Sequence, residues 1–265
     1  AEIMNKVEIA LIKKSLVAIM NISREDSALI VHDEYAREVA EIFKTALRES
    51  QVPVALYKIP ENFRPLRNVP IELENKIQEL KPSLCFNLLR GIGEETPFRI
   101  SLFKLETKAG AKVGHAPDIT IDMLVHPLSA DFAVIRQKAE MLIARFKDAD
   151  SLKISTSKGT ALAFSVKDRM WESDVEIKKG KMGNLPAGEI WIAPVEESVS
   201  GTVVVDGSIG DVGQVKKELI IKVSEGKITS IESQDIETLN RVEKLLAVNE
   251  NAKLAGEFGI GINPR

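Results

Sequence analysis

The feature that most constrains the fold is an alternation of two hydrophobic periods over about the first 150 residues. Short apolar runs typical of buried strands occur at 28–31, 52–59, 83–89 and 111–117. Between them, apolar residues recur at helical spacing, at 34–50, 69–81 and 97–110. Strands that alternate with helices in this way pair in parallel, because each parallel pairing needs a crossover connection. We therefore expect residues 1–150 to form an α/β domain with a parallel sheet flanked by helices.

Two further helices are expected in this domain. Near the N-terminus, apolar residues recur at helical spacing, namely Ile3, Val7, Ala10, Leu11 and Val17. The second helix covers 132–148, and the polar run KDADS follows it. The sequence pattern changes there, from alternating helix and strand signals to mainly strand signals. We therefore place the domain boundary at residues 149–151.

The remaining residues, 151–265, are rich in strand signals. Two hairpins are expected, one at 152–166 around Ser157-Lys158-Gly159 and one at 218–233 closed by Glu225-Gly226. Strands are also expected within 188–195 and 201–208. A single helix follows at 235–248, with Asp235 as its N-cap. Its predicted buried face consists of Ile236, Leu239, Val242, Leu245 and Leu246. This half therefore predicts a β-rich α+β domain.

Composition limits the classes of function. The 265 residues carry a net charge of −3, and acidic and basic residues are mixed along the chain, which argues against nucleic-acid or membrane partners. No run approaches the roughly 18 apolar residues of a membrane span, and the N-terminus lacks the apolar core of a signal peptide. The single cysteine, Cys85, favours a reducing compartment. We expect a cytoplasmic protein.

Polar side chains follow the predicted parallel strands. His32 and Asp33 end the first strand, Arg90 follows the third, and His115 ends the fourth. Ligands of parallel sheets bind outside the carboxyl ends of the strands, so these four residues are candidates for a site. The alternative is that strand ends are polar because the chain leaves the core there.

Several well-known catalytic signatures are absent from the sequence. It contains no HExxH, paired CxxC, GxSxG or GxxxxGK[ST] motif, and no GxGxxG after a strand. Its three histidines are His32, His115 and His126, and they do not form a closely spaced ligand pair. Classical zinc hydrolases and Ser-His-Asp enzymes are therefore disfavoured.

Two glutamates stand in unusual apolar surroundings. Glu189 in NLPAGEIWIAP and Glu257 in LAGEFGIG each follow a small residue and a glycine, and each opens an apolar, strand-like run. A carboxylate buried in such a place is unfavourable unless it is paired or bound to a cation. A divalent metal ion is one natural partner. The alternative is that each glutamate caps a turn or pairs with a lysine.

Other conspicuous residues have plainer interpretations. Glu196 and Glu197 flank a predicted turn and are expected at the surface. Asp206 with Gly207 resembles a turn between strands, and Trp171 and Trp191 are expected as core or interface anchors.

The segments NLPAGEIWIAPVEESVSGTVVVDGS and LAGEFGIGINP together resemble the thermophilic metallopeptidase family that contains aminopeptidases T and S. The resemblance extends more weakly upstream through LKISTSKGTALAFSV and HAPDITIDML. It implies that Glu189 and Glu257 are metal ligands, with Glu257 bridging two ions. It also implies divalent zinc, cobalt or manganese, peptide substrates from which N-terminal residues are removed, and a homodimer.

In that family the remaining ligands, histidines and an aspartate, lie beyond the Asn-Pro of the second motif, whereas this sequence ends at Arg265. We therefore expect the metal site to be incomplete in this chain, with weak metal binding and little or no catalysis. Three explanations are considered, namely a fragment of a longer protein, a natural short relative, or histidines supplied by a partner subunit.

Two alternative functions remain open at this point. Relatives with the same architecture use one iron ion to open a dihydroxypyridine ring, and three ligands around iron would suit that oxygen chemistry. A third hypothesis is a non-catalytic small-molecule binding protein on the same scaffold, in which Glu189 and Glu257 make ordinary hydrogen bonds or ion pairs.

Overall fold

The computed structural model describes residues 4–265, except for the side chain of Asp211. Residues 1–3 lie outside the described residues, and with them Ile3, which the sequence pattern assigns to the first helix. The chain forms two compact units. The first takes in the residues up to Met141, Ser173–Glu189 and Gly261–Arg265, and the second takes in Leu142–Glu172 and Ile190–Ile260.

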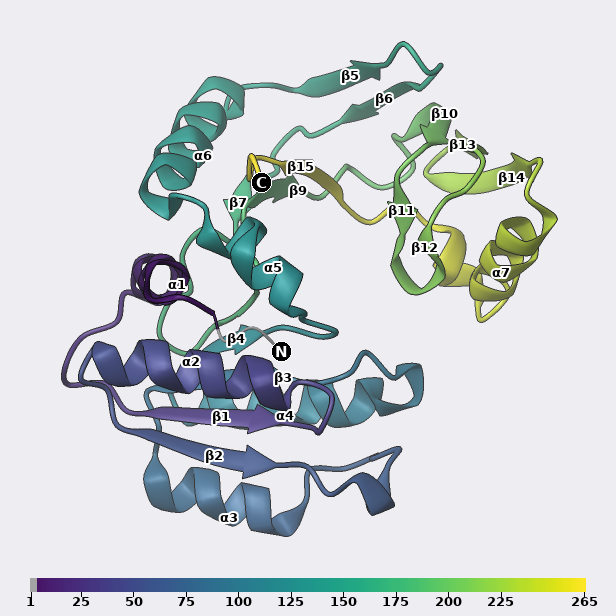
Figure 1. The fold of residues 1–265 in the computed structure, drawn as a ribbon. Coiled ribbons are helices and arrows are strands. Elements are labelled where there is room, and N and C mark those ends of the chain that lie inside the picture. Colours follow the sequence, from purple (N-terminus) through teal and green to yellow (C-terminus); the bar gives the residue numbers. More distant parts are fainter. Residues whose placement is uncertain (1–3) are drawn as a thin grey trace. The chain divides into compact units, whose positions relative to one another are not determined.

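The first unit is built on a sheet with the strand order β2-β1-β3-β4-β8 (Figure 1). Its strands are β1 Ala28–His32, β2 Val54–Lys58, β3 Leu84–Leu88, β4 Lys112–His115 and β8 Met182–Asn184. Every neighbouring pair is parallel, as the alternation in the sequence predicts. The edge strand β8 was not predicted, because Met-Gly-Asn contains no apolar run.

Helices pack on both faces of this sheet. On one face, Ile77 of α3 and Leu102 of α4 join a core that includes Cys85 of β3. The next residue of β3, Phe86, points to the other face and meets Phe43 of α2, with ring centroids 5.4 Å apart. Full burial of a side chain of this kind contributes roughly 1.5–3 kcal/mol.

The helices of the chain are α1 Lys6–Met20, α2 Arg37–Glu49, α3 Ile71–Leu80, α4 Thr96–Lys108, α5 Ile121–Val125, α6 Phe132–Phe146 and α7 Ile236–Leu246.

The second unit contains an antiparallel sheet with the order β14-β13-β10-β6-β5. Its strands are β5 Ser151–Ser155, β6 Ala161–Ser165, β10 Ser200–Val205, β13 Leu219–Ser224 and β14 Lys227–Ser233. The two predicted hairpins are present as β5-β6 and β13-β14. The turn of the second hairpin has positive φ angles of 49° at Glu225 and 73° at Gly226. The parallel α/β architecture and the β-rich part expected from the sequence are therefore both found.

Shorter elements complete the chain. A three-stranded sheet has the order β15-β9-β7, and a two-stranded sheet joins β11 and β12. These strands are β7 Glu172–Ser173, β9 Glu189–Ile192, β11 Ser208–Ile209, β12 Gly213–Gln214 and β15 Phe258–Gly261. The 3-10 helices are η1 Glu61–Phe63, η2 Gly93–Glu95, η3 Pro127–Ser129, η4 Gly210–Val212 and η5 Glu250–Lys253.

Helix α7 begins as predicted but buries a narrower face. Asp235 accepts hydrogen bonds from the backbone N–H groups of Glu237 and Thr238 and so caps the helix. Ile236 and Leu245 were predicted to be buried, but 62% and 38% of their surfaces are exposed. Ile236 lies roughly 120° around the helix from the buried Val242, since successive residues turn by about 100°. The side chains that reach the core are Val242, Leu239 and Leu246.

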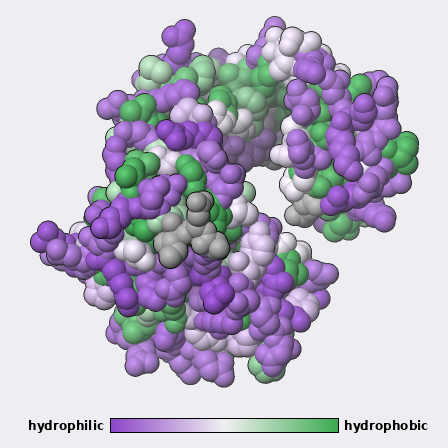
Figure 2. Space-filling view, in the orientation of Figure 1, coloured by the Kyte–Doolittle hydropathy of each residue, from purple (hydrophilic) through white to green (hydrophobic). Residues whose placement is uncertain are grey.

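Hydrophilic residues dominate the face of the molecule shown in Figure 2, and hydrophobic residues occur in small groups among them. Such a surface is ordinary for a folded domain, because isolated apolar residues are common there. Across residues 4–265, no helix combines the length and the apolar character needed to cross a membrane.

Candidate functional site

Four of the candidate residues predicted from the sequence lie at, or just after, the carboxyl ends of the parallel strands. From β1 the chain passes to β2 on one side, whereas β3 pairs with β1 on the other side. The strand order therefore reverses between β1 and β3, and such a switch point is where doubly wound sheets bind ligands. Asp33 follows β1 and Arg90 follows β3, so both stand at this position.

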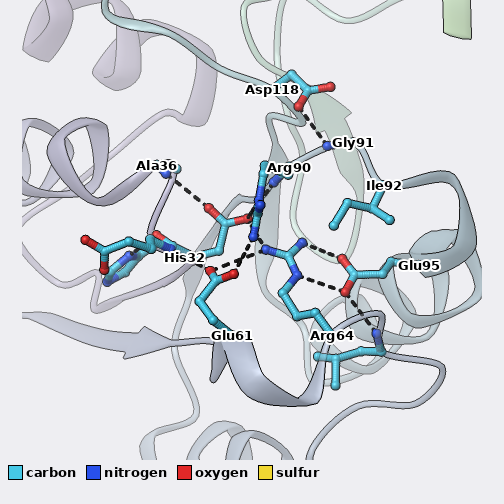
Figure 3. Close-up of polar contacts among 12 residues, drawn as sticks. His32, Ala36, Glu61, Arg64, Arg90, Gly91, Ile92, Glu95 and Asp118 are labelled. Atoms are coloured by element: carbon cyan, nitrogen blue, oxygen red, sulfur yellow. Dashed lines mark hydrogen bonds and ion pairs between the residues drawn. The ribbon is translucent and has the colours of Figure 1, made fainter.

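Five charged residues meet here and form what we term the strand-end cluster, namely Asp33, Glu61, Arg64, Arg90 and Glu95 (Figure 3). One oxygen of Asp33 accepts hydrogen bonds from Arg64 and from the backbone N–H of Arg90, the latter at 2.9 Å. The Nε of Arg64 donates to Glu95 at 2.9 Å, and a second nitrogen of Arg64 bonds the other oxygen of Glu95. Arg90 also pairs with Glu61.

The charges of this cluster are held by mutual pairing. Burial alone would raise the pKa of Asp33, but hydrogen bonds from Arg90 and Arg64 outweigh it and lower that pKa. Burial opposes ionisation of Glu95 in the same way, and its bonds with Arg64 again lower the pKa. The buried guanidinium of Arg64 therefore bonds two buried carboxylates, Asp33 and Glu95, and lies 3.6 Å from an oxygen of Glu61. The cluster ties together the loops after β1, β2 and β3, so its geometry favours a structural role.

His32 and His115 have separate surroundings. The Nδ1 of His32 lies 2.9 Å from the backbone oxygen of Asp33. His115 is buried beside Phe103, and burial lowers its pKa to about 4, with a smaller contribution from Arg99. A neutral imidazole is therefore expected at pH 7. In the sheet, His115 of β4 lies opposite Asn87 of β3. It is not a member of the strand-end cluster.

A further buried acid, Glu106, is not among the residues predicted from the sequence. Glu106 of α4 is fully buried, and its Oε2 accepts a hydrogen bond from Asn87 at 2.7 Å. Burial raises its pKa to about 8, against smaller opposing effects of hydrogen bonds from Asn87 and Cys85. The available signal was periodicity, because Glu106 stands four residues after the buried Leu102 and eight after the buried Phe98.

Glu189, the first predicted metal ligand, is half-buried at the start of β9 and belongs to the first unit. Its backbone N–H and that of Gly188 both donate to Oδ1 of Asp174, at 2.8 Å each. On the other side, the amide of Asn263 donates to the carbonyls of Ala187 and Pro127, at 3.0 and 2.9 Å. Burial raises the pKa of Asp174 despite these backbone hydrogen bonds.

Glu257, the second predicted ligand, is exposed, belongs to the second unit and directly precedes β15. The two glutamates offer the oxygen donors that hard divalent ions prefer, so their chemistry suits such an ion. Over the described part of the chain, however, no group of three or more His, Cys, Asp or Glu residues is arranged to hold a metal ion. These residues alone do not close a coordination shell.

The remaining candidates have structural surroundings. Glu196 pairs with Arg169, and Glu197 occupies a turn with φ of 63°. Asp206 lies between β10 and β11, as a turn residue would. Trp171 packs against Phe146 with ring centroids 5.5 Å apart, and Trp191 is half-buried in β9.

Comparison with solved structures identifies the fold. The chain is similar to 2,5-dihydroxypyridine dioxygenase from Pseudomonas putida KT2440, with a TM-score of 0.71, 12% identity, and coverage of 98% of this chain and 77% of that one. It is also similar to AmpT from Thermus thermophilus, with a TM-score of 0.67, 13% identity, and coverage of 97% and 78%. At such identities the similarity shows the fold alone.

Comparison with curated protein sequences gives no match. Comparison with family models gives one that covers residues 130–264, about half of the chain, and that describes a thermophilic metalloprotease family, M29. This range contains both Gly-Glu motifs from which the resemblance was predicted, and it confirms that prediction. The chain belongs to the thermophilic metalloprotease (M29) family.

Proposed function

We propose that this protein is a metal-dependent aminopeptidase, which releases N-terminal residues from peptides. The observation that carries the proposal is the family match over residues 130–264, because this range contains Gly188-Glu189 and Gly256-Glu257. At the level of the family, the match already implies a peptide substrate and a divalent metal ion. The similarity to the fold of AmpT agrees with this assignment.

Within this proposal, Glu189 and Glu257 supply carboxylate ligands. Their oxygens suit zinc, cobalt or manganese, and each glutamate opens or directly precedes a strand of the sheet β15-β9-β7. Two divalent ions held by carboxylates of this kind would polarise a peptide carbonyl and lower the pKa of a bound water. The part of this chain would be to fix the two carboxylates, and donors besides these two are needed to complete a site.

Metal binding and hydrolysis test the proposal together. We expect purified protein to bind Mn²⁺ weakly in calorimetric titrations, and any cleavage of leucyl-p-nitroanilide to be abolished by a chelator. Glu189→Gln and Glu257→Gln should each weaken Mn²⁺ binding, because they remove a negative charge at nearly constant volume. Glu197→Gln, in an exposed turn, is the matched control. Unchanged Mn²⁺ binding in both test variants would contradict the assigned ligands.

The fold similarity to the dioxygenase supports a second candidate, an iron-dependent oxygenase, although the family match favours the peptidase. Oxygen consumption with Fe²⁺ and 2,5-dihydroxypyridine would distinguish the two. A third candidate is a binding protein without catalysis. It predicts that the double variant of Glu189 and Glu257 to Gln keeps full affinity for its ligand.

The assembly and the location of the protein are also proposals. We propose a homodimer, for which light scattering would give about twice the chain mass of 29.2 kDa. We also propose a cytoplasmic location, since the one cysteine, Cys85, is free and buried. The functional division of the chain near residues 149–151 belongs to the same proposal, and separate expression of the two parts would test it.

A further inference from the structure

The backbone that carries Glu189 is held firmly from one side by a carboxylate. A single oxygen of Asp174 accepts the backbone N–H groups of both Gly188 and Glu189, at 2.8 Å each. The backbone N–H of Asp174 in turn donates to the carbonyl of Glu189 at 3.3 Å. Both distances to the Asp174 oxygen lie on the short side of the usual N–H···O range. Asp174 therefore constrains the peptide units on both sides of Glu189.

The same segment is held from the other side by Asn263. Its side-chain amide donates to the carbonyls of Ala187 and Pro127, at 3.0 and 2.9 Å. The carbonyl of Gly188 accepts the backbone N–H groups of Ile262 and Asn263, at 2.8 and 3.2 Å. Asn263 thus joins three stretches of the first unit that are far apart in the sequence.

Gly188 explains how Asn263 can approach so closely. The φ angle of Gly188 is +128°, which residues with a side chain rarely adopt. A Cβ atom at this position would lie 2.6 Å from the Cβ of Asn263, which is too close for any side chain. The glycine is therefore required both by the backbone conformation and by the packing of Asn263.

We propose that Asp174 and Asn263 are positioning residues that fix the direction of the Glu189 side chain. This inference rests on the proposed role of Glu189 as a metal ligand. A side chain leaves the backbone in a direction set by the peptide units on either side, and these two residues bond those units. Carboxylates preorganised in this way bind ions more tightly, because less freedom is lost on binding.

The first readout needs no metal. In Asp174→Ala, NMR-detected hydrogen exchange at the amides of Gly188 and Glu189 should accelerate, whereas Asp174→Asn should retain protection because its amide oxygen still accepts both bonds. In Asn263→Ala, exchange at Ile262 should accelerate. Asp235→Ala is the matched control, since Asp235 also accepts two backbone N–H groups but at the start of α7. Unchanged exchange in Asp174→Ala and Asn263→Ala would overturn the inference.

The second readout is Mn²⁺ affinity, measured by calorimetry on the same variants. We expect Asp174→Ala and Asn263→Ala to weaken binding by roughly 10–100-fold, as removal of residues that orient metal ligands does. Asp174→Asn and Asp235→Ala should bind as the unaltered protein does. If Glu189→Gln abolishes binding while Asp174→Ala and Asn263→Ala leave it unchanged, the positioning role is wrong. If Glu189→Gln itself has no effect, the proposed role of Glu189 as a metal ligand fails, and the exchange data decide separately whether Asp174 and Asn263 hold the segment.

Discussion

Glu95 and Glu106 are both fully buried, and Glu95 directly precedes helix α4 whereas Glu106 lies near its end. Burial opposes ionisation of both, but Arg64 lies against Glu95 and lowers its pKa, whereas Glu106 bonds only neutral partners in the described contacts and its pKa rises to about 8. At neutral pH, therefore, one carboxyl is charged and the other carries a proton. The comparison shows that the nearest partner, and not burial, decides the charge of an acid in this unit.

The largest effect should follow from removing the partner. In Arg64→Met, Asp33 and Glu95 would remain buried without their shared cation, and breaking a buried pair in this way costs about 3–5 kcal/mol. Urea unfolding at pH 7 measures the loss, and acid should partly restore stability, because protonation neutralises both carboxyls. Arg169→Met breaks the exposed pair with Glu196 and should change stability little. Equal losses of stability in Arg64→Met and Arg169→Met would contradict the conclusion that the ionised state of Glu95 depends on its partner.

The next effect concerns the dependence of stability on pH. The folded state holds the proton of Glu106 up to about pH 8, whereas the unfolded state releases it near its ordinary pKa of 4.5. The stabilisation is therefore complete below pH 4.5 and is lost as pH rises towards about 8.

Glu106→Gln should remove this dependence, because glutamine stays neutral at every pH. The free energy of unfolding of the unaltered protein should fall, relative to Glu106→Gln, by on the order of 1–3 kcal/mol between about pH 5 and pH 7. Unfolding curves at several pH values measure the difference. Parallel curves for the two proteins would show that Glu106 is ionised in the folded state.

The smallest effect should follow Cys85→Ala. The hydrogen bond from the thiol of Cys85 lowers the pKa of Glu106 slightly against the larger effect of burial. Its removal should cost about 1 kcal/mol at pH 5 and extend the fall in stability to higher pH, because the pKa of Glu106 in the folded state would rise further. The same unfolding series measures this shift, and a shift to lower pH would mean that the thiol is not a donor to Glu106.

The sequence predicts those parts of the fold that depend on local periodicity. Strands β1 to β4 and helices α2 to α4 follow apolar runs that are visible without knowledge of the rest of the chain. Strand β8 could not be predicted, because Met182–Asn184 becomes a strand through pairing with β4 and not through its own composition. Periodicity locates the buried face of a helix but not the width of that face. For this reason Ile236 and Leu245 are predicted to be buried in α7, although both are exposed.

The candidate residues show the same limit. Asp33 and Arg90 could be identified because the ends of parallel strands meet at one edge. Their partner Arg64 could not, since it stands in a loop and reaches Asp33 from 31 residues away. Asn263 lies within a motif that the sequence does reveal, but its contact with Ala187 spans 76 residues. Which groups meet over such separations is decided by tertiary packing.

The edge strand β8 also has a consequence for folding during synthesis. A ribosome releases the chain from its N-terminus, so β1 to β4 emerge well before Met182–Asn184. Until then, β4 presents an open edge of the parallel sheet, and such edges are sites of pairing with other chains. The first unit is completed only when Asn263 has emerged, because the last of its three stretches begins at Gly261. The maturation of this unit thus requires translation to continue at least through Asn263.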